Sequence, residues 1–187
     1  MAARRLTRAG ARRAPPVVAF SGPSGAGKTT LLLALVRELR RRGLAVAAVK
    51  HSGHPHGFDV PGKDSDRLLR AGAVGVAVQG ASQMALFRPP LPGGPRALAA
   101  WLPPADVVLV EGWKAARIPR VEVHRRAVSR DFACARGRGF VAVVTDEPPP
   151  RALPTFAPGQ VRALADWLCE RFGLRPRPRR AARRAST

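Results

Sequence analysis

The sequence predicts an α/β domain of three layers, in which helices lie on both sides of a largely parallel central sheet. Short apolar runs typical of buried strands alternate with segments whose apolar residues recur at helical spacing. The first two strands are joined through a helix, and such a crossover makes them parallel. The length of 187 residues fits one domain of ordinary size.

The first three elements have the clearest patterns. Residues 17–21 form a short apolar run that ends in a glycine-rich turn, as a buried parallel strand does. From Thr29 to Arg42, leucine and valine recur at helical spacing, and Gly43 then stops the helix. Residues 45–50 give the second strand. The same criteria predict helices at 64–71, 98–102 and 161–172, strands at 74–79, 84–87, 107–110, 121–124 and 140–144, and loops at 51–63 and 89–95.

Both ends of the chain differ in composition from the middle. Residues 1–14 and 174–187 carry eleven arginines and no acidic residue, and hold few large apolar side chains. We therefore expect disordered basic tails on either side of a folded domain at 15–173. Such tails attract nucleic acid through charge alone. An arginine-biased chain with solvated ends explains the formal charge of +21 more simply, so no specific nucleic acid is expected as a partner.

The remaining composition favours a cytoplasmic protein. No apolar run approaches the roughly 18 residues that a membrane helix needs, so no membrane association is expected. The two cysteines, Cys134 and Cys169, lie far apart and outside any metal-ligand or redox spacing. We expect both to be small buried apolar residues in a reducing compartment.

Residues 22–29, Gly-Pro-Ser-Gly-Ala-Gly-Lys-Thr, match the G-x-x-x-x-G-K-[ST] pattern of a P-loop, between a predicted strand and a predicted helix. The glycines let backbone N–H groups face phosphate oxygens, and the helix N-terminus adds its positive end. We expect Lys28 to reach the β- and γ-phosphates as a catalytic cation, and the Thr29 hydroxyl to bind Mg²⁺. The expected nucleotide-binding residues are Gly22, Pro23, Ser24, Gly25, Ala26, Gly27, Lys28, Thr29 and Thr30.

The strand at 107–110 supplies an acidic residue for the same site. Asp106 precedes this strand and Glu111 follows it. Ligands of a parallel sheet lie beyond the carboxyl ends of its strands, which places Glu111 beside the P-loop and Asp106 at the opposite edge. We expect Glu111 to be catalytic, either by helping to hold the magnesium ion or by orienting the attacking water. Asp106 is expected to be a loop or cap residue.

The loop after the second strand gathers several groups that bind ligands. It holds His51, His54, His56, Asp59, Lys63 and Asp64. Three imidazoles can bind a divalent metal; alternatively, a mobile polar loop can hydrogen-bond the ligand or a partner. Lys63 and Asp64 precede a helix and are placed to sense the γ-phosphate or magnesium.

Lysine is rare in this chain. Of 33 basic residues only Lys28, Lys50, Lys63 and Lys114 are lysines. Their scarcity indicates positions that need a compact ammonium group rather than a planar guanidinium.

Asp146 follows the strand at 140–144. A carboxylate there can accept the two N–H groups that distinguish guanine from adenine, because its oxygens only accept hydrogen bonds. A turn before Pro148 explains the same Thr-Asp pair without a ligand. We keep Asp146 as the candidate for base recognition.

These motifs resemble one family, the molybdopterin-guanine dinucleotide biosynthesis protein MobB. The resemblance lies in the P-loop with its continuation to Leu32, in Val-Lys-His at 49–51, in Pro-Gly-Lys-Asp-Ser at 61–65, in Ala-Gly-Ala at 71–73 and in Leu-Val-Glu-Gly-Trp-Lys at 109–114. In the family's order these stretches span most of residues 17–172. The P-loop alone is generic, whereas the 61–65 and 109–114 stretches together are specific.

The resemblance implies a homodimeric GTP-binding protein with weak GTPase activity. It would assist the molybdenum cofactor guanylyltransferase in joining GMP to molybdopterin, and molybdopterin itself is a further candidate ligand. Residues 22–30 would bind GTP and Mg²⁺, and Glu111 would be the acidic motif. The residues implied for the neighbouring surface are Lys50, His51, Asp59, Lys63 and Asp64. The loop departs from the family pattern, because Pro55 separates His54 from His56 and only Asp59 remains of an acidic stretch.

Three other interpretations compete with this one. The P-loop also suits a small-molecule or nucleotide kinase, but no segment clearly provides an acceptor site or an arginine-bearing lid. The histidine-rich loop suits a metal-insertion GTPase. The tails suit a nucleic-acid binder whose affinity falls steeply with salt and needs no nucleotide.

Overall fold

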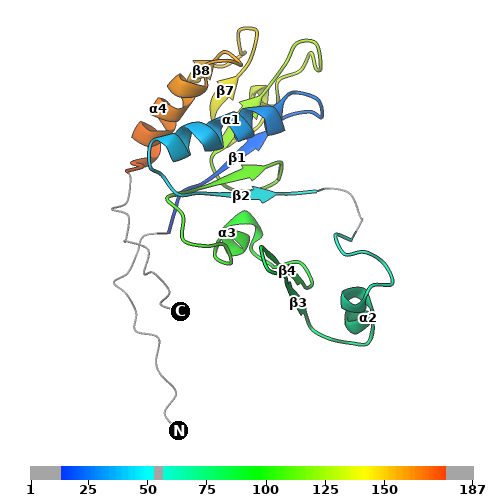
Figure 1. The fold of residues 1–187 in the computed structure, drawn as a ribbon. Helices are drawn as coiled ribbons and strands as arrows, with labels where there is room; N and C mark the ends of the chain where they lie inside the picture. Colours follow the sequence, from blue (N-terminus) through cyan, green and yellow to red (C-terminus); the bar gives the residue numbers. More distant parts are fainter. Residues whose placement is uncertain (1–13, 53–56, 176–187) are drawn as a thin grey trace.

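A computed structural model describes residues 14–52 and 57–175, which form a parallel sheet with helices on both faces and a small arm beside it (Figure 1). The elements are β1 Val17–Ser21, α1 Lys28–Arg41, β2 Val46–Lys50, α2 Asp64–Arg70, β3 Val76–Gln79, β4 Met84–Phe87, α3 Gly94–Ala99, β5 Val107–Glu111, β6 Arg120–Val123, a 3₁₀ turn at Ala133–Ala135, β7 Phe140–Val144, β8 Thr155–Phe156 and α4 Val161–Phe172. The predicted α/β class is confirmed.

The main sheet has six strands in the order β2-β5-β1-β6-β7-β8, and every neighbouring pair is parallel. The strand before the P-loop, β1, lies inside the sheet between β5 and β6. The carboxyl ends of β5 and β2 therefore lie on one side of the P-loop, and those of β6 and β7 on the other.

Successive side chains of a strand point to opposite faces of the sheet, and a hydrophobic core forms on each face. Val18 and Phe20 of β1 pack in the cluster that includes leucines of α1 and α4. Val17 and Ala19 point the other way, into a smaller cluster with Leu98 of α3. Because both faces are covered, β1 is apolar at nearly every position, as expected of a strand in a parallel sheet.

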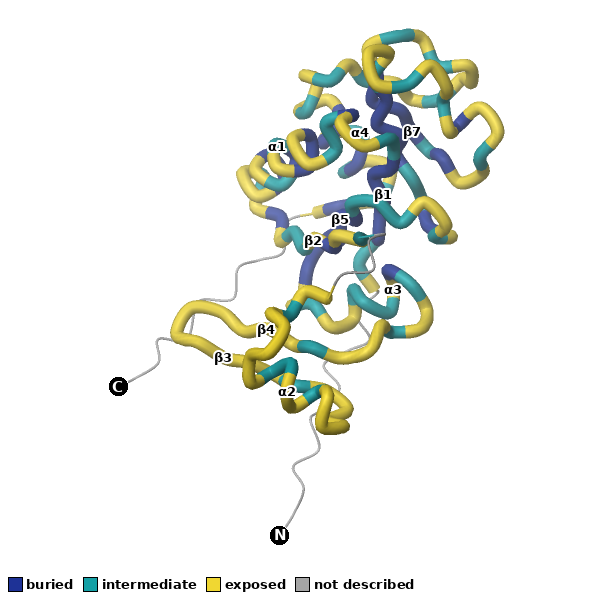
Figure 2. The backbone as a smooth tube through the Cα atoms, turned by 90° about the vertical axis from the view of Figure 1, so that its right-hand side faces the viewer, coloured by how far each residue is buried: buried dark blue, intermediate teal, exposed yellow. Residues whose placement is uncertain are grey.

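The arm, residues 57–88, consists of α2 and the β3–β4 hairpin. The hairpin is a separate antiparallel sheet of two strands. None of the residues in α2, β3 or β4 is buried, in contrast to the strands of the main sheet (Figure 2). The arm is therefore attached to the sheet without contributing to its core.

Several predicted boundaries need correction. The helix expected at 98–102 spans Gly94–Ala99 instead, because Pro95 is set at its first turn, where a fixed φ favours helix and no N–H is needed. The strand expected from Val74 begins at Val76. The two-residue strand β8 was not predicted, since so short a run shows no alternation. Most of the predicted tails lie outside the described residues, but Leu174 is buried in the main core, so the folded domain extends past residue 173.

The cysteine and membrane expectations can be compared with the described residues. No helix there is long and apolar enough to span a membrane. Cys134 is fully buried and Cys169 is half-buried, and both are free thiols. Burial, with a smaller contribution from neighbouring Glu122, raises the pKa of the Cys134 thiol to about 12. Cys134 therefore stays a neutral packing residue.

Candidate nucleotide-binding site

The P-loop connects β1 to α1, and glycine is required at its positions for two different reasons, backbone conformation and lack of space. Gly25 and Gly27 adopt φ angles of +79° and +83°, a region that side chains disfavour. Gly22 needs space instead: a Cβ atom there would lie 2.1 Å from the carbonyl oxygen of Val123 in β6. The loop is therefore fixed both by its own turns and by close contact with the neighbouring strand.

Lys28, the first residue of α1, folds back over this loop. Its Nζ donates a hydrogen bond of 2.7 Å to the carbonyl oxygen of Pro23. Partial burial lowers the pKa of Lys28; Glu111 opposes this shift, while Lys114 and Lys50 add to it. Three of the four lysines and one carboxylate, Glu111, are thus close enough for their charges to act on one another beside the P-loop, a net cationic arrangement that suits the phosphates of a nucleotide.

Glu111 is at the carboxyl end of β5, as predicted. Its Oε1 accepts a 2.8 Å hydrogen bond from the Thr29 hydroxyl, across 82 positions of sequence. Parallel pairing sets this position, because Glu111 is in register with Phe20 of β1 and with Lys50 of β2. A hydroxyl and a carboxylate are the oxygen ligands that Mg²⁺ takes beside substrate phosphates, so the residues present fit this ion.

Residues 111–113 also contact His51, which directly follows β2. The His51 N–H donates to the Glu111 carbonyl oxygen at 3.0 Å, and the His51 ring stacks on Trp113 with centroids 4.5 Å apart. Trp113 has a φ of +56°, which is rare for a large side chain. Gly112, at +87°, passes so close to His51 that a Cβ atom would lie 3.1 Å from its carbonyl oxygen. The Glu-Gly-Trp stretch is therefore a tight turn that fixes His51 near Glu111.

The opposite side of the P-loop is formed by the ends of β6 and β7. Asp146 is exposed, and its Oδ1 accepts a hydrogen bond of 3.0 Å from the backbone N–H of Arg126. That hydrogen bond is the main cause that lowers the pKa of Asp146. The structure thus places Asp146 one strand beyond β6, separated from Glu111 by the P-loop.

Arg125 is a residue that the sequence analysis missed. One of its guanidinium nitrogens, Nη2, lies 3.7 Å from the position a Cβ atom would take on Gly27. Nothing in the sequence marks it, since it is one arginine among many.

The remaining loop candidates separate into two groups. Lys50 and His51 lie at the end of β2 near Glu111, whereas Lys63 and Asp64 lie at the start of α2, apart from the P-loop in both Figure 1 and Figure 2. Asp59 accepts hydrogen bonds from the Val60 N–H and the Ser65 hydroxyl, both at 2.9 Å, and so organises the entry to α2. The structure does not bring these three arm residues together with the phosphates.

Metal binding by the histidine loop can be tested only in part. His54 and His56 lie outside the described residues. Within 14–52 and 57–175, no three His, Cys, Asp or Glu side chains gather closely enough to hold a metal ion. Asp106, by contrast, behaves as the predicted structural residue: it is buried and accepts a 2.8 Å hydrogen bond from the Ala45 N–H.

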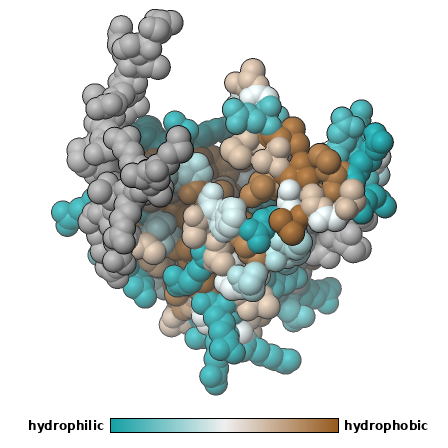
Figure 3. Space-filling model, turned by 90° about the horizontal axis from the view of Figure 1, so that it is seen from below, coloured by the Kyte–Doolittle hydropathy of each residue, from teal (hydrophilic) through white to brown (hydrophobic). Residues whose placement is uncertain are grey.

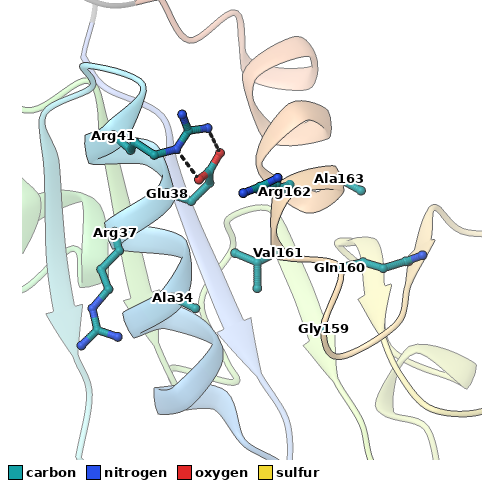
Figure 4. Close-up of a pocket in the computed structure, with 9 residues that line it drawn as sticks. All are labelled: Ala34, Arg37, Glu38, Arg41, Gly159, Gln160, Val161, Arg162 and Ala163. Carbon is teal, nitrogen blue, oxygen red and sulfur yellow. Dashed lines mark hydrogen bonds and ion pairs between the residues drawn. The ribbon is translucent and has the colours of Figure 1, made fainter.

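Two hollows lie away from the P-loop itself. One, of about 1200 Å³, lies between the end of β2, α3 and the arm, and three of the candidate residues, Lys50, His51 and Asp59, contribute to its wall beside Trp101 and Trp113. The other, of about 600 Å³, is a groove between α1 and α4 (Figure 4). There Glu38 accepts two hydrogen bonds from Arg41 of the same helix, and Arg42 at the end of α1 donates to Asp166 and to the Arg162 carbonyl oxygen of α4, so this groove is a packing seam between the helices.

The parallel sheet, the loop after β1 and the threonine–glutamate pair define a protein of the P-loop nucleotide-binding class. The family model of Molybdopterin guanine dinucleotide synthesis protein B matches residues 17–146. This chain therefore belongs to the MobB family, as the sequence resemblance indicated, and not to the kinases or the metal-insertion GTPases.

Individual relatives agree with this assignment. The molybdopterin-guanine dinucleotide biosynthesis adapter protein of Escherichia coli is 33% identical over 162 residues, which cover 83% of this chain and 92% of that protein. The adapter protein of Haemophilus influenzae is 37% identical over 62% of this chain and 66% of its own length. The crystal structure of a MobB homologue from Bacillus stearothermophilus, 31% identical, superposes with a TM-score of 0.62 and covers 85% of this chain and 99% of that one.

Proposed function

We propose that this protein binds GTP with Mg²⁺ at its P-loop and acts as the accessory protein for attaching GMP to molybdopterin. The observation that carries the proposal is the 2.8 Å hydrogen bond between the Thr29 hydroxyl and Glu111, which assembles two magnesium ligands beside a complete P-loop. The name of the matching family, a synthesis protein for the guanine dinucleotide, supports the pathway.

Each residue has a defined role in this proposal. Backbone N–H groups of residues 22–30 and the N-terminus of α1 receive the phosphates. Lys28 leaves the Pro23 carbonyl and moves its ammonium group to the β- and γ-phosphates. Bound magnesium would neutralise phosphate charge. The Glu111 carboxylate beside Thr29 would help to hold the magnesium ion and would orient the water that attacks the γ-phosphate, which gives a weak GTPase with one carboxylate at the reacting end of the site.

The partner in this proposal is the molybdenum cofactor guanylyltransferase, with molybdopterin as its second substrate. The hollow beside β2 supports such a contact. It joins the cations Lys50 and Arg88 to the rings of Trp101 and Trp113, and Lys50 is also one of the lysines whose charge acts on Lys28 of the P-loop. A surface of this chemistry suits an anionic, partly aromatic group.

We further propose that the arm holds two copies of this chain together as a homodimer. Met84 and Leu86 project from one face of the hairpin and Val78 from the other, and all three are 44–65% exposed. Seen from the side of the arm, apolar side chains gather in a broad group (Figure 3). An isolated two-stranded hairpin is marginally stable in water, and exposed apolar side chains on both of its faces favour burial against another chain, so a second hairpin is the natural cover.

Light scattering of the full chain tests the homodimer. Wild type should have the mass of two chains, and Leu86→Glu should shift it toward one. The matched control is Leu33→Glu, which adds the same charge at a comparably exposed leucine on α1, and it should stay dimeric. A monomeric wild type, or a dimeric Leu86→Glu, would refute the arm as the interface.

The nucleotide proposal is tested by calorimetric titration with GTP and with ATP in the presence of magnesium. We expect GTP to bind more tightly than ATP, and Lys28→Ala to abolish measurable binding of both, because the loop then lacks its mobile cation. Lys63→Ala is the control, since this lysine lies in the arm, and it should bind like wild type. A preference for ATP would contradict the assigned nucleotide.

A further inference from the structure

The segment that follows β6 closes against the P-loop. Arg125 begins a turn in which its carbonyl oxygen accepts hydrogen bonds from the N–H groups of Val128 and Ser129, at 2.9 and 3.0 Å. A Cβ atom on Gly25 would lie 4.0 Å from a methyl group of Val128, and one on Gly27 would lie 3.7 Å from Nη2 of Arg125. This turn, residues 125–129, is therefore the wall of the P-loop on the side away from Glu111.

Arg125 brings an unneutralised charge to this wall. Its Nη1 donates a 2.8 Å hydrogen bond to the carbonyl oxygen of His124, and among the described residues no carboxylate lies within ion-pairing distance of its guanidinium. Asp146 interacts with it only through longer-range charge. A half-buried guanidinium beside a loop of inward-facing N–H groups has the geometry that binds phosphate oxygens.

The backbone on each side of Arg125 is anchored. The preceding His124 is fully buried, with its ring stacked on Phe132 at 3.8 Å and Nδ1 3.3 Å from the Thr145 hydroxyl. The following residue, Arg126, donates its N–H to Asp146. The backbone at Arg125 is thus held against β7, and the hydrogen bond from its guanidinium to the His124 carbonyl oxygen orients the side chain before any ligand binds, so less conformational freedom is lost on binding.

We propose that Arg125 binds the α- and β-phosphates of the nucleotide from the side opposite Lys28 and Glu111. Thr29 and Glu111 mark the magnesium and γ-phosphate end of the site, and Asp146 marks the end proposed for the base. Arg125 lies between them, next to Gly27. The inference rests on the proposed nucleotide site and adds that the diphosphate, rather than the γ-phosphate, is what this arginine contacts.

The prediction concerns binding rather than turnover. Arg125→Ala should weaken GTP and GDP by the same factor, roughly 10- to 100-fold, which is the loss expected for a hydrogen bond to a charged group. The KM for GTP should rise accordingly while kcat stays within about twofold, because an interaction made equally in ground and transition states affects KM alone. Arg125→Lys should recover part of the affinity.

The experiment is calorimetric titration of the full chain with Mg-GTP and Mg-GDP, together with steady-state GTP hydrolysis. Arg130→Ala is the matched control: it removes an exposed arginine seven residues beyond β6 with no hydrogen bond or ion pair among the described residues, and it should change neither affinity by more than about twofold. Melting temperatures of all variants establish that each is folded, and Arg125→Lys carries the test if Arg125→Ala unfolds.

Each outcome bears on a different claim. Equal losses for GTP and GDP support the proposal. A loss for GTP alone would overturn it by moving Arg125 to the γ-phosphate, and unchanged affinities would remove Arg125 from the site. If wild type binds neither nucleotide while remaining folded, the proposed function itself fails, and this inference fails with it.

Discussion

The two sides of the P-loop carry charge in different ways. On the β5 side, the charges of Lys50, Lys114 and the single carboxylate Glu111 act on Lys28. On the β6 side, the residues before and after Arg125 are fixed by backbone hydrogen bonds: the His124 N–H donates to the Val144 carbonyl oxygen of β7, and the Arg126 N–H donates to the Asp146 carboxylate. Under the proposed function, the difference means that the long side chains on the β5 side can rearrange when the γ-phosphate and magnesium bind or leave. The β6 side would present a fixed surface to the part of the nucleotide that hydrolysis does not change.

The largest effect should come from Gly22→Ala, which damages both sides at once. Its added Cβ atom would lie 2.1 Å from the Val123 carbonyl oxygen, so β6 or the loop must move. Overpacking of this kind should lower the free energy of unfolding by about 2–3 kcal/mol, measured by urea denaturation. Gly159→Ala is the control, because no atom lies within 4 Å of its added Cβ, and its stability should be nearly unchanged.

Glu111→Gln separates the β5 side from the β6 side. The amide is nearly isosteric and can still accept from Thr29, so GTP affinity should stay within a few-fold of wild type. Loss of the charge that holds magnesium and orients water should slow GTP hydrolysis by about 100-fold, a typical share for one positioned acid–base group. A single-turnover assay measures it. Hydrolysis at the wild-type rate would eliminate Glu111 as the carboxylate that holds magnesium or orients the attacking water.

Asp146→Asn is the smallest change and tests only the β6 side. Asparagine keeps an oxygen for the Arg126 N–H, so the turn should stay intact, but it replaces an acceptor by a donor toward the base. The ratio of GTP to ATP affinity should fall by about tenfold, equivalent to one hydrogen bond, with hydrolysis of bound GTP unaffected.

The pH dependence of that ratio offers an independent check. The pKa of Asp146 is lowered below the usual range for aspartate, so its carboxylate stays ionised throughout the neutral and mildly acidic range. It loses its charge only when the pH falls through this lowered pKa. The wild-type preference for GTP should therefore be the same at about pH 7.5 and about pH 5.5, well above the ordinary aspartate pKa. A preference that vanishes within this interval would point to a group other than Asp146.

The same two sides differ in how much of them could be predicted from sequence. The P-loop is contiguous, and Glu111 follows from one rule about parallel strands, so both could be located without coordinates. The rarity of lysine indicated Lys28, Lys50 and Lys114, which the fold gathers around Glu111. Lys63 is also one of the few lysines, but it lies in the arm. Its position could not be predicted, because no local sequence pattern shows which loops return to the sheet.

Arg125 could not be predicted, for two physical reasons. Arginine is so common in this chain that its presence at one position carries little information. Its contact with Gly27 depends on the pairing of β6 with β1, which brings together residues about a hundred positions apart. The function of a polar residue at a strand end depends on such tertiary contacts and cannot be predicted from local sequence. The buried strands β1 and β5, by contrast, can be predicted from their apolar composition alone.

The arm has a consequence for how the molecule fluctuates. None of the residues in α2, β3 or β4 is buried, so opening this region exposes little additional apolar surface and costs far less than unfolding β1 or β5. Amide hydrogens of the hairpin will then exchange with solvent quickly in a single chain and slowly when a second chain covers them. The rate of deuterium uptake in β1 therefore measures the stability of the fold. The rate of uptake in β3 and β4 measures whether two chains associate through the arm, as proposed.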